Sequence, residues 1–227
     1  DLQNGGEHVI AQTLRMFTNL TLISLESCNI THEQLLPIAD AIRDHRSLEI
    51  LDLQSNRIGN AGCETISTLL GDPNSSLHTL DLTSNLIGGE AAVILANSLA
   101  NNTKLHYLYL AGNQIDQRVV DIFKKPLCNT SSINCTYSSN HTLEYLGLPQ
   151  HRGDEQLDSL LNLNECTNKS HVAIKKILKF HPNIDMEPFF EWNMEGEGER
   201  NLKALPHVIA WFDRAGDAVA EDVEEGG

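Results

Sequence analysis

An eleven-residue pattern that returns every 28 or 29 residues constrains this chain more than any other feature. Four segments share the form LxxLxLxx(N/C)xI, with Ile accepted in place of Leu, and they begin at Leu20, Leu48, Leu77 and Leu105. A fifth, partial copy begins at Leu143, 38 residues after the fourth, and lacks the Asn. Chance would not keep four such copies in register, so we expect stacked copies of one structural unit.

Each position of the pattern has a physical interpretation. Alternating leucines predict a short strand that turns its leucines to one side and the intervening residues to the other. The Asn after the strand is expected to be buried and to hydrogen-bond backbone groups of adjacent turns. Cys28 takes this position in the first copy, which indicates a structural role. Between the copies, apolar residues at helical spacing predict helices over Glu33–Arg43, Ala61–Leu70, Glu90–Ala100 and Asp116–Phe123, and a further helix over Glu7–Met16 precedes the first copy.

Strands and full helices that alternate at this period resemble the ribonuclease-inhibitor subclass of leucine-rich repeats, over about residues 1–165. The resemblance implies an α/β solenoid, a horseshoe with parallel strands inside and α-helices outside. The longer spacing before Leu143 predicts an insertion of about ten residues on one rim, within about 124–140. The chain begins in mid-repeat, which we interpret as a fragment of a longer solenoid, with an N-terminal covering helix as the alternative.

The period is lost after residue 165. A helix is predicted over His171–Phe180, and His181-Pro182 ends it. The end of a solenoid must be covered, so we expect residues 166–215 to form a helical C-terminal cap, with a peptide-docking groove as the alternative. Two segments supply further apolar side chains for it: Met186–Trp192 and Leu202–Arg214. Residues 187–227 carry eleven acidic and three basic side chains, and we expect 216–227 to be an acidic, disordered tail.

Charge and cysteine content narrow the environment of the protein. The net charge of −15 argues against nucleic acid and anionic membranes as partners and favours a basic protein. No apolar stretch approaches a bilayer span. Five cysteines without a CxxC pair are typical of reduced thiols inside the cell. Secretion is the alternative, because eight N-x-S/T sequons are present, although recurring turn-forming Asn residues also explain them: Asn19, Asn29, Asn74, Asn101, Asn129, Asn134, Asn140 and Asn168.

The strand residues that alternate with the leucines form the candidate binding surface on the concave face. Tyrosines gather on the later repeats, where they offer contact area and a polar tip. Asp52 and Asp81 fall on neighbouring strands about 4.7–4.9 Å apart, where a basic group of a partner would relieve their repulsion. The alternative is a merely solvated face. The predicted site residues are Glu26, Ile50, Asp52, Gln54, Thr79, Asp81, Thr83, Tyr107, Tyr109 and Tyr145.

A second column, at the second position of the pattern, holds Glu49, His78, His106 and Glu144. These residue types bind zinc, but they also form hydrogen-bond ladders, and we favour the ladder over a metal site.

We expect neither an enzyme nor a cofactor. The chain lacks a phosphate-binding Gly loop, GxSxG, HExxH and a kinase signature, and an open strand face would not exclude water from a carboxylate pair. The expected function is a protein-interaction scaffold. One alternative is a regulator of a small GTPase, similar to Ran GTPase-activating proteins at the level of the fold alone. The other is a repeat fragment of a sensor or receptor protein.

Overall fold

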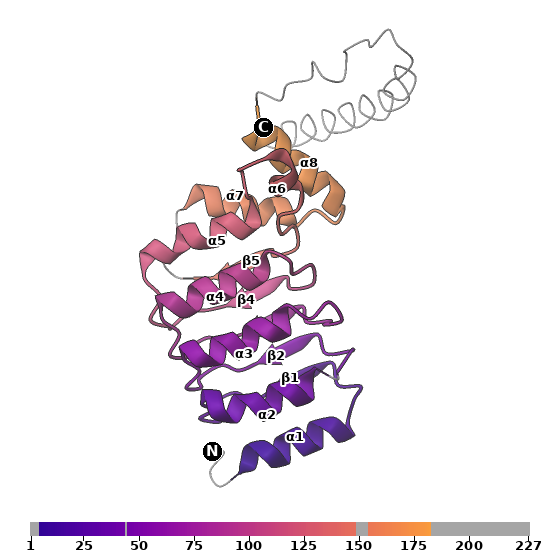
Figure 1. Cartoon of the computed structure of the whole chain (residues 1–227), viewed down its shortest axis with the longest axis vertical. Coiled ribbons are helices and arrows are strands. Elements are labelled where there is room, and N and C mark those ends of the chain that lie inside the picture. Colours follow the sequence, from indigo (N-terminus) through magenta and orange to yellow (C-terminus); the bar gives the residue numbers. More distant parts are fainter. Residues whose placement is uncertain (1–4, 44, 149–153, 183–227) are drawn as a thin grey trace, which may run out of the picture.

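The computed structural model describes residues 5–43, 45–148 and 154–182, which form a stack of strand–helix units (Figure 1). Strands and helices alternate along the chain, and the helices lie together on one side of the stack. The elements are α1 (Gly6–Met16), β1 (Leu22–Ser24), α2 (His32–Ile42), β2 (Ile50–Asp52), α3 (Asn60–Leu70), β3 (Thr79–Asp81), α4 (Gly89–Leu99), β4 (Tyr107–Tyr109), the 3-10 turn η1 (Gln117–Val119), α5 (Val120–Leu127), α6 (Ile133–Tyr137), β5 (Tyr145–Gly147), α7 (Glu155–Asn164) and α8 (Lys169–Phe180).

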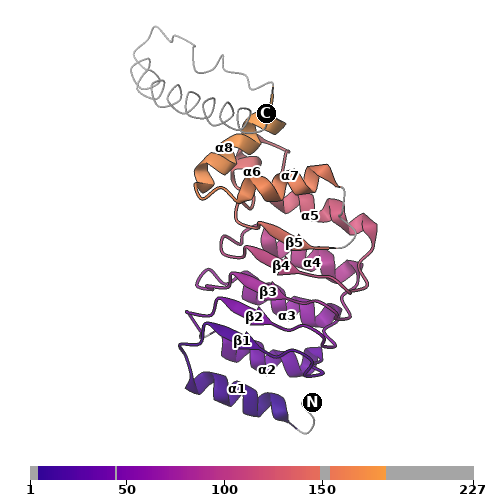
Figure 2. The same ribbon diagram turned by 180° about the vertical axis from the view of Figure 1, so that it is seen from behind.

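The five strands form one parallel sheet in sequence order, β1-β2-β3-β4-β5 (Figure 2). Their register follows the repeat: the third pattern position of each copy pairs with the third position of the next, so Leu22 lies opposite Ile50 and Tyr107 opposite Tyr145. Parallel strands need a crossover between them, and here each crossover contains a helix. The predicted α/β solenoid with parallel strands and outer helices is therefore confirmed.

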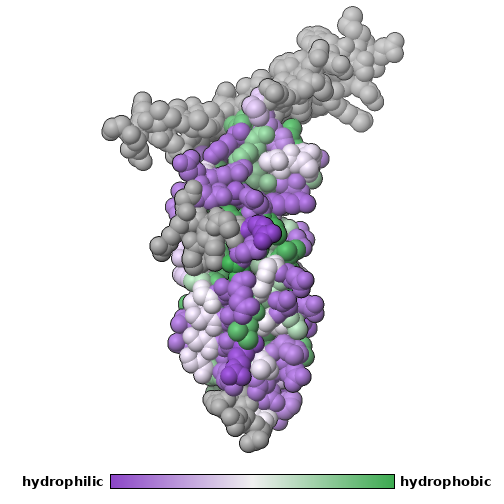
Figure 3. Space-filling model, turned by 90° about the vertical axis from the view of Figure 1, so that its left-hand side faces the viewer, coloured by the Kyte–Doolittle hydropathy of each residue, from purple (hydrophilic) through white to green (hydrophobic). Residues whose placement is uncertain are grey.

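The core lies between the sheet and the helices. The central strand residues, which occupy the fourth pattern position, are buried in all five strands: Ile23, Leu51, Leu80, Leu108 and Leu146. Apolar residues on the inner faces of the helices meet them, among them Leu35 and Ile38 of α2, which are fully buried. Hydrophilic residues interspersed with a few hydrophobic ones cover the side of the stack shown in Figure 3.

The asparagine of the pattern joins neighbouring repeats, as predicted. In Asn85, Nδ2 donates to the carbonyl oxygen of Leu53 in the preceding repeat at 2.9 Å, and Oδ1 accepts from the N–H of Ile58 at 3.0 Å. Asn56 and Asn113 make the equivalent bonds one repeat earlier and one repeat later. Each buried amide therefore replaces the backbone partners that the chain lacks where a strand ends.

One position earlier, the backbone enters the left-handed region. Ser27, Ser55 and Ser84 have φ of 56–57°, and Gly112 has φ of 70°. A β-carbon on Gly112 would lie 2.9 Å from Oγ of Ser84, so glycine also relieves a close contact there. The eighth pattern position is therefore restricted to small residues by backbone conformation, a constraint that we did not predict.

The insertion lies slightly later than we predicted. α5 follows a 3-10 turn and continues to Leu127, so the extra residues separate this helix from Leu143. That separation is 16 positions, against 6 from Leu99 to Leu105, a difference of ten residues. The inserted segment contains the short helix α6, and its contacts with α8 hold it against the end of the stack.

The helix predicted over His171–Phe180 is present as α8, and it carries a lysine inside the protein. Lys176 is fully buried, and its Nζ donates to the carbonyl oxygens of Leu127 (2.7 Å) and Asn140 (2.9 Å). These bonds fasten α8 to both ends of the insertion. The expectations for Met186–Trp192, Leu202–Arg214 and 216–227 lie outside the described residues.

All five cysteines lie in the described part of the chain and are free thiols. Among the described helices, none has the length and apolar character needed to cross a membrane.

Candidate protein-binding surface

The strand face, which we define as the side of the sheet that carries the third and fifth pattern positions, is the surface turned away from the helices (Figure 2). All ten predicted site residues lie in the described part of the chain. Six of them, Ile50, Asp52, Gln54, Thr79, Asp81 and Thr83, are half-buried in the middle of this face, while Glu26 is exposed.

Three tyrosines form one end of the strand face. Tyr107 and Tyr145, paired in register on β4 and β5, are 39% and 43% exposed. The ring of Tyr109 is half-buried and lies 5.0 Å, between centroids, from that of Tyr145 in a tilted arrangement. Such tilted contacts are favourable for aromatic pairs and hold the rings in defined positions. The predicted clustering of the tyrosines is therefore present in the structure.

Room for this cluster comes from Gly147, which is opposite Tyr109 on β5. A β-carbon at Gly147 would lie 3.2 Å from both Cα of Tyr109 and Cε1 of Tyr145. A larger residue would crowd the backbone of Tyr109 and the ring of Tyr145, so one of them would have to shift. Sequence reasoning did not assign this role to Gly147, because the pattern does not show where the rings lie.

The two aspartates in the middle of the face are already engaged by the protein itself. Oδ1 of Asp52 accepts from the N–H of Gln54 at 3.0 Å, and Oδ1 of Asp81 accepts from the N–H of Thr83 at 2.8 Å. Oδ2 of Asp52 also accepts from the hydroxyl of Ser24 at 2.8 Å. Each carboxylate thus binds the backbone directly after its strand, in addition to carrying a negative charge. This structural role was not predicted.

The column at the second pattern position forms a ladder along one rim of the strand face. The rings of His78 and His106 stack with centroids 4.6 Å apart, and Nδ1 of His106 lies 3.0 Å from Oε1 of Glu144. Burial lowers the pKa of His106, although Glu144 opposes the shift. Within the described residues, no group of three His, Cys, Asp or Glu side chains is arranged to hold a metal ion.

Glu144 connects this ladder to the tyrosines and to α8. Its Oε2 accepts from the hydroxyl of Tyr107 at 3.4 Å, and its Oε1 lies 3.4 Å from Nζ of Lys169. The charge of Glu144 raises the pKa of Tyr107, so this phenol keeps its proton well above neutral pH. Lys169 was missed by sequence reasoning because it lies outside the repeats.

A solenoid with one parallel sheet and with asparagines that join neighbouring repeats is typical of leucine-rich-repeat proteins, and this is the class to which the protein belongs. A family model described as Leucine Rich repeat matches residues 44–67, 74–96 and 101–117. The chain is a ribonuclease-inhibitor-like leucine-rich-repeat protein.

Several curated mouse proteins are similar to part of the chain. Ribonuclease inhibitor is 33% identical over 116 residues, which are 51% of this chain and 25% of that protein. NACHT, LRR and PYD domains-containing protein 12 is 28% identical over 193 residues, 82% of this chain and 18% of that protein. NACHT, LRR and PYD domains-containing protein 14 is 26% identical, over 52% of this chain and 13% of that protein. The chain thus spans at most a quarter of these relatives.

Two solved structures share the fold. The actin-binding site 2 of leiomodin-1 has a TM-score of 0.56 and 18% identity, over 69% of this chain and 88% of that structure. The C-terminal domain of tropomodulin from Caenorhabditis elegans has a TM-score of 0.55 and 14% identity, over 70% and 93%. At these identities the likeness concerns the fold alone.

Proposed function

We propose that this protein is a non-catalytic scaffold that binds another protein on its strand face. The observation that carries the proposal is the tyrosine cluster of Tyr107, Tyr109 and Tyr145, which leaves large aromatic side chains partly exposed on a rigid sheet. Tyrosines freeze few torsions on binding and are enriched among residues that dominate interface energies. A ribonuclease inhibitor and an actin-binding segment among the similar proteins support a binding role.

The partner that fits this face presents apolar groups to the tyrosines and a basic group to Asp52 and Asp81. Each aspartate uses one oxygen to accept from a backbone N–H. Because the carboxylates keep their negative charge while they do so, a lysine or arginine can still pair with them. Glu26 and the strand residues between the charged and aromatic ends complete the proposed contact surface: Ile50, Gln54, Thr79 and Thr83.

Neither alternative function has an observation of its own among the described residues. A GTPase regulator or a sensor fragment would share the repeats, and a shared fold does not assign the function.

The test begins with the full chain as bait in its native cells and identification of the bound proteins by mass spectrometry. Binding of each purified candidate is then measured with the wild-type chain and with a variant in which all three tyrosines are alanine. We expect the dissociation constant to rise by at least about tenfold for the true partner, in line with the loss of aromatic anchors. An unchanged constant would refute the placement of the site.

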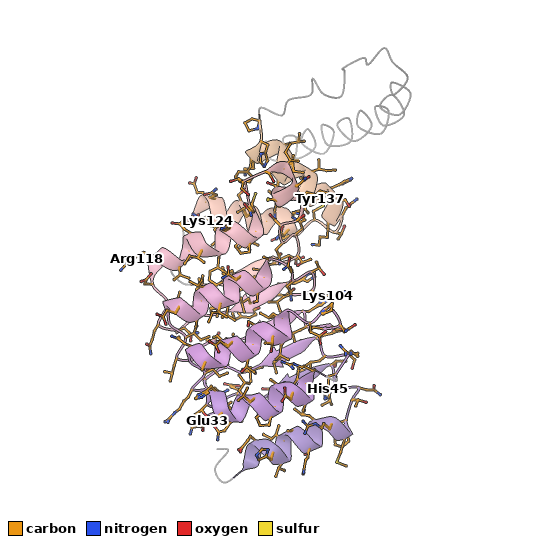
Figure 4. The ribbon with its side chains drawn as sticks, viewed as in Figure 1. Glu33, His45, Lys104, Arg118, Lys124 and Tyr137 are labelled. Carbon is orange, nitrogen blue, oxygen red and sulfur yellow. The ribbon has the colours of Figure 1, made fainter. Side chains whose placement is uncertain are left out.

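A matched control separates binding from folding. Glu33→Ala changes an exposed residue on α2, on the helical side of the stack (Figure 4), and should leave the affinity unchanged. Circular dichroism and the melting temperature of the triple variant show whether the solenoid is intact. Asp81→Asn keeps an acceptor for the N–H of Thr83 while removing the charge, so it should weaken the salt dependence of binding without unfolding the protein.

A further inference from the structure

A groove of about 640 Å³ opens on the helical side of the stack, away from the strand face. One wall is formed by the end of α4, the second by α5, and the third by the insertion that contains α6. Its volume lies within the roughly 300–1,000 Å³ of pockets that bury small ligands or a few side chains. Figure 4 shows two of the elements that border the groove, with Lys124 labelled on α5 and Tyr137 on α6.

The groove combines apolar and polar lining residues. Val93 of α4 and Ala100, which follows α4, line it together with Ile122 and Pro126 of α5. The polar lining consists of amides, hydroxyls and two charged side chains: Asn97, Asn101, Asn129, Ser138, Ser139, Asp121 and Lys125. A lining that mixes apolar and polar groups can accept a peptide segment that carries both aromatic and acidic side chains.

The described chain ends beside α6, which belongs to the insertion that forms one wall of the groove. α8 ends at Phe180, and Nε2 of His181 lies 2.7 Å from Oγ1 of Thr136 in α6. Thr136 is adjacent in sequence to Cys135, which lines the groove. Forty-five residues follow Pro182. The four positions from Pro182 to Met186 can span about 13 Å at roughly 3.3 Å per residue, so the segment from Met186 onward begins within that distance of Pro182.

We propose that Met186–Trp192, of sequence MEPFFEW, docks into this groove on the outer side of the solenoid. The segment contains Phe189, Phe190 and Trp192 within four positions, in a part of the chain that is otherwise rich in acidic residues. Burial of such aromatic side chains is favourable because it removes a large apolar surface from water. Leu157 and Leu160 of α7 and Ile177 of α8 are already buried, so these side chains are not available to contact the aromatic residues.

Docking would place Met186–Trp192 in a groove that is separate from the proposed binding face. The strand face and the groove lie on opposite sides of the sheet, so both can be occupied at the same time.

Tryptophan fluorescence of the full chain tests the proposal, because both tryptophans, Trp192 and Trp211, lie beyond Pro182. Trp211→Phe leaves Trp192 as the reporter. We expect blue-shifted emission and severalfold weaker acrylamide quenching than in the urea-unfolded chain. Adding Ala100→Arg, which places a charged side chain in the groove, should return both values towards those of the unfolded chain. Gln12→Arg, which adds the same charge at an exposed position of α1, should leave both values unchanged.

A thiol trap locates the segment. With Glu191→Cys, mild oxidation should form a disulfide between Cys135 and the introduced thiol, at a yield independent of protein concentration. The hydroxyls of Ser131 and Ser132 lower the pKa of Cys135, which favours its reactive thiolate. The same oxidation of a Glu225→Cys variant serves as the control and should give little of this bond.

Four outcomes would overturn the proposal. The first is emission from Trp192 that is equal in the folded and unfolded chains. The second is emission that is unaffected by Ala100→Arg while circular dichroism shows a folded solenoid. The third is a disulfide that forms only between two chains at high concentration. Protection of Trp211 in place of Trp192 would assign the groove to Leu202–Arg214 and would likewise exclude Met186–Trp192 as its occupant.

Discussion

Nζ of Lys176 lies 3.3 Å from Nδ1 of His141, 35 positions earlier in the chain. With the carbonyl oxygens of Leu127 and Asn140, this gives the ammonium three acceptors for its three N–H bonds. His141 must then be neutral and carry its proton on Nε2, which lies 3.0 Å from the carbonyl oxygen of Tyr137. The contact between α8 and the insertion therefore depends on the protonation of both residues.

The first prediction concerns acid. Burial, together with the charge of Lys176, lowers the pKa of His141 from 6.5 to about 4. Between these values the unfolded chain binds a proton that the folded chain does not, so the free energy of unfolding falls as the pH decreases through this window. Urea denaturation at several pH values in this window should show a smaller loss of unfolding free energy for His141→Asn than for the wild type, because asparagine does not titrate. Equal losses in both proteins would contradict this assignment.

The second prediction concerns alkali. Burial lowers the pKa of Lys176 from 10.5 to about 7, so the unfolded chain binds more protons between these values, and the contribution of Lys176 to stability rises with pH. The difference in unfolding free energy between wild type and Lys176→Met should grow by about 2 kcal/mol from about pH 7 to pH 9, because one fully shifted proton contributes about 1.4 kcal/mol per pH unit. Lys104→Met, at an exposed position, serves as the control variant.

The third prediction is a stabilising substitution. His45 is 3% exposed, and neither ring nitrogen has a partner among the described residues. It lies three positions before the first leucine of its repeat, a place that Asn102 and Asn140 hold in later repeats. Those amides donate to the last residue of a helix one repeat further back, Leu70 of α3 and Leu99 of α4, at 2.8 Å in both cases. His45→Asn should raise the free energy of unfolding by about 1 kcal/mol, since an unsatisfied buried polar group costs about 1–3 kcal/mol.

Chemical denaturation of the His45→Asn variant beside His8→Asn, which changes an exposed histidine, provides the measurement and its control. A destabilised His45→Asn variant would show that the imidazole contributes more by packing than it loses by its missing hydrogen bonds.

The fourth prediction separates two of the sequons. Asn140 is 2% exposed, and its Nδ2, the atom to which a glycan would be attached, donates to the carbonyl oxygens of Leu99 and Asn102 at 2.8 Å. Asn140→Asp should destabilise the protein by about 3 kcal/mol, because it replaces two buried donors with a charge. Asn74→Asp, at an exposed sequon, should change stability by less than about 0.5 kcal/mol. Similar effects in thermal or urea unfolding would contradict the structural role of Asn140.

The repeat itself could be predicted because equivalent residues of every copy pack in the same way. Leu51 and Leu80 are buried for the reason that governs Ile23 and Leu108, so a pattern in the sequence translates directly into strands and their register. Asn85 could likewise be assigned its backbone partners, because an amide after a strand has few other roles. Local periodicity carried these predictions.

Contacts outside the period could not be predicted in the same way. Lys176 belongs to an amphipathic helix rich in lysines, and nothing in its spacing distinguishes it from the exposed Lys179. Its partners lie 35 to 49 positions away, in an insertion with no counterpart in the other repeats. The turn bonds of Asp52 and Asp81 were missed for a different reason: alternation predicts the side of the sheet to which a residue points, but not its rotamer.

The left-handed backbone conformations at Ser27, Ser55, Ser84 and Gly112 belong to the framework of the solenoid and not to the side chains that it exposes on the strand face. The coil is held by these backbone conformations and by the amides beside them, and neither group depends on the side chains of the third pattern position. Those positions can therefore diversify, by evolution or by design, at little cost to the solenoid. Retargeting of the surface should begin with Ile50, Thr79, Tyr107 and Tyr145, and should leave Asp52 and Asp81 in place.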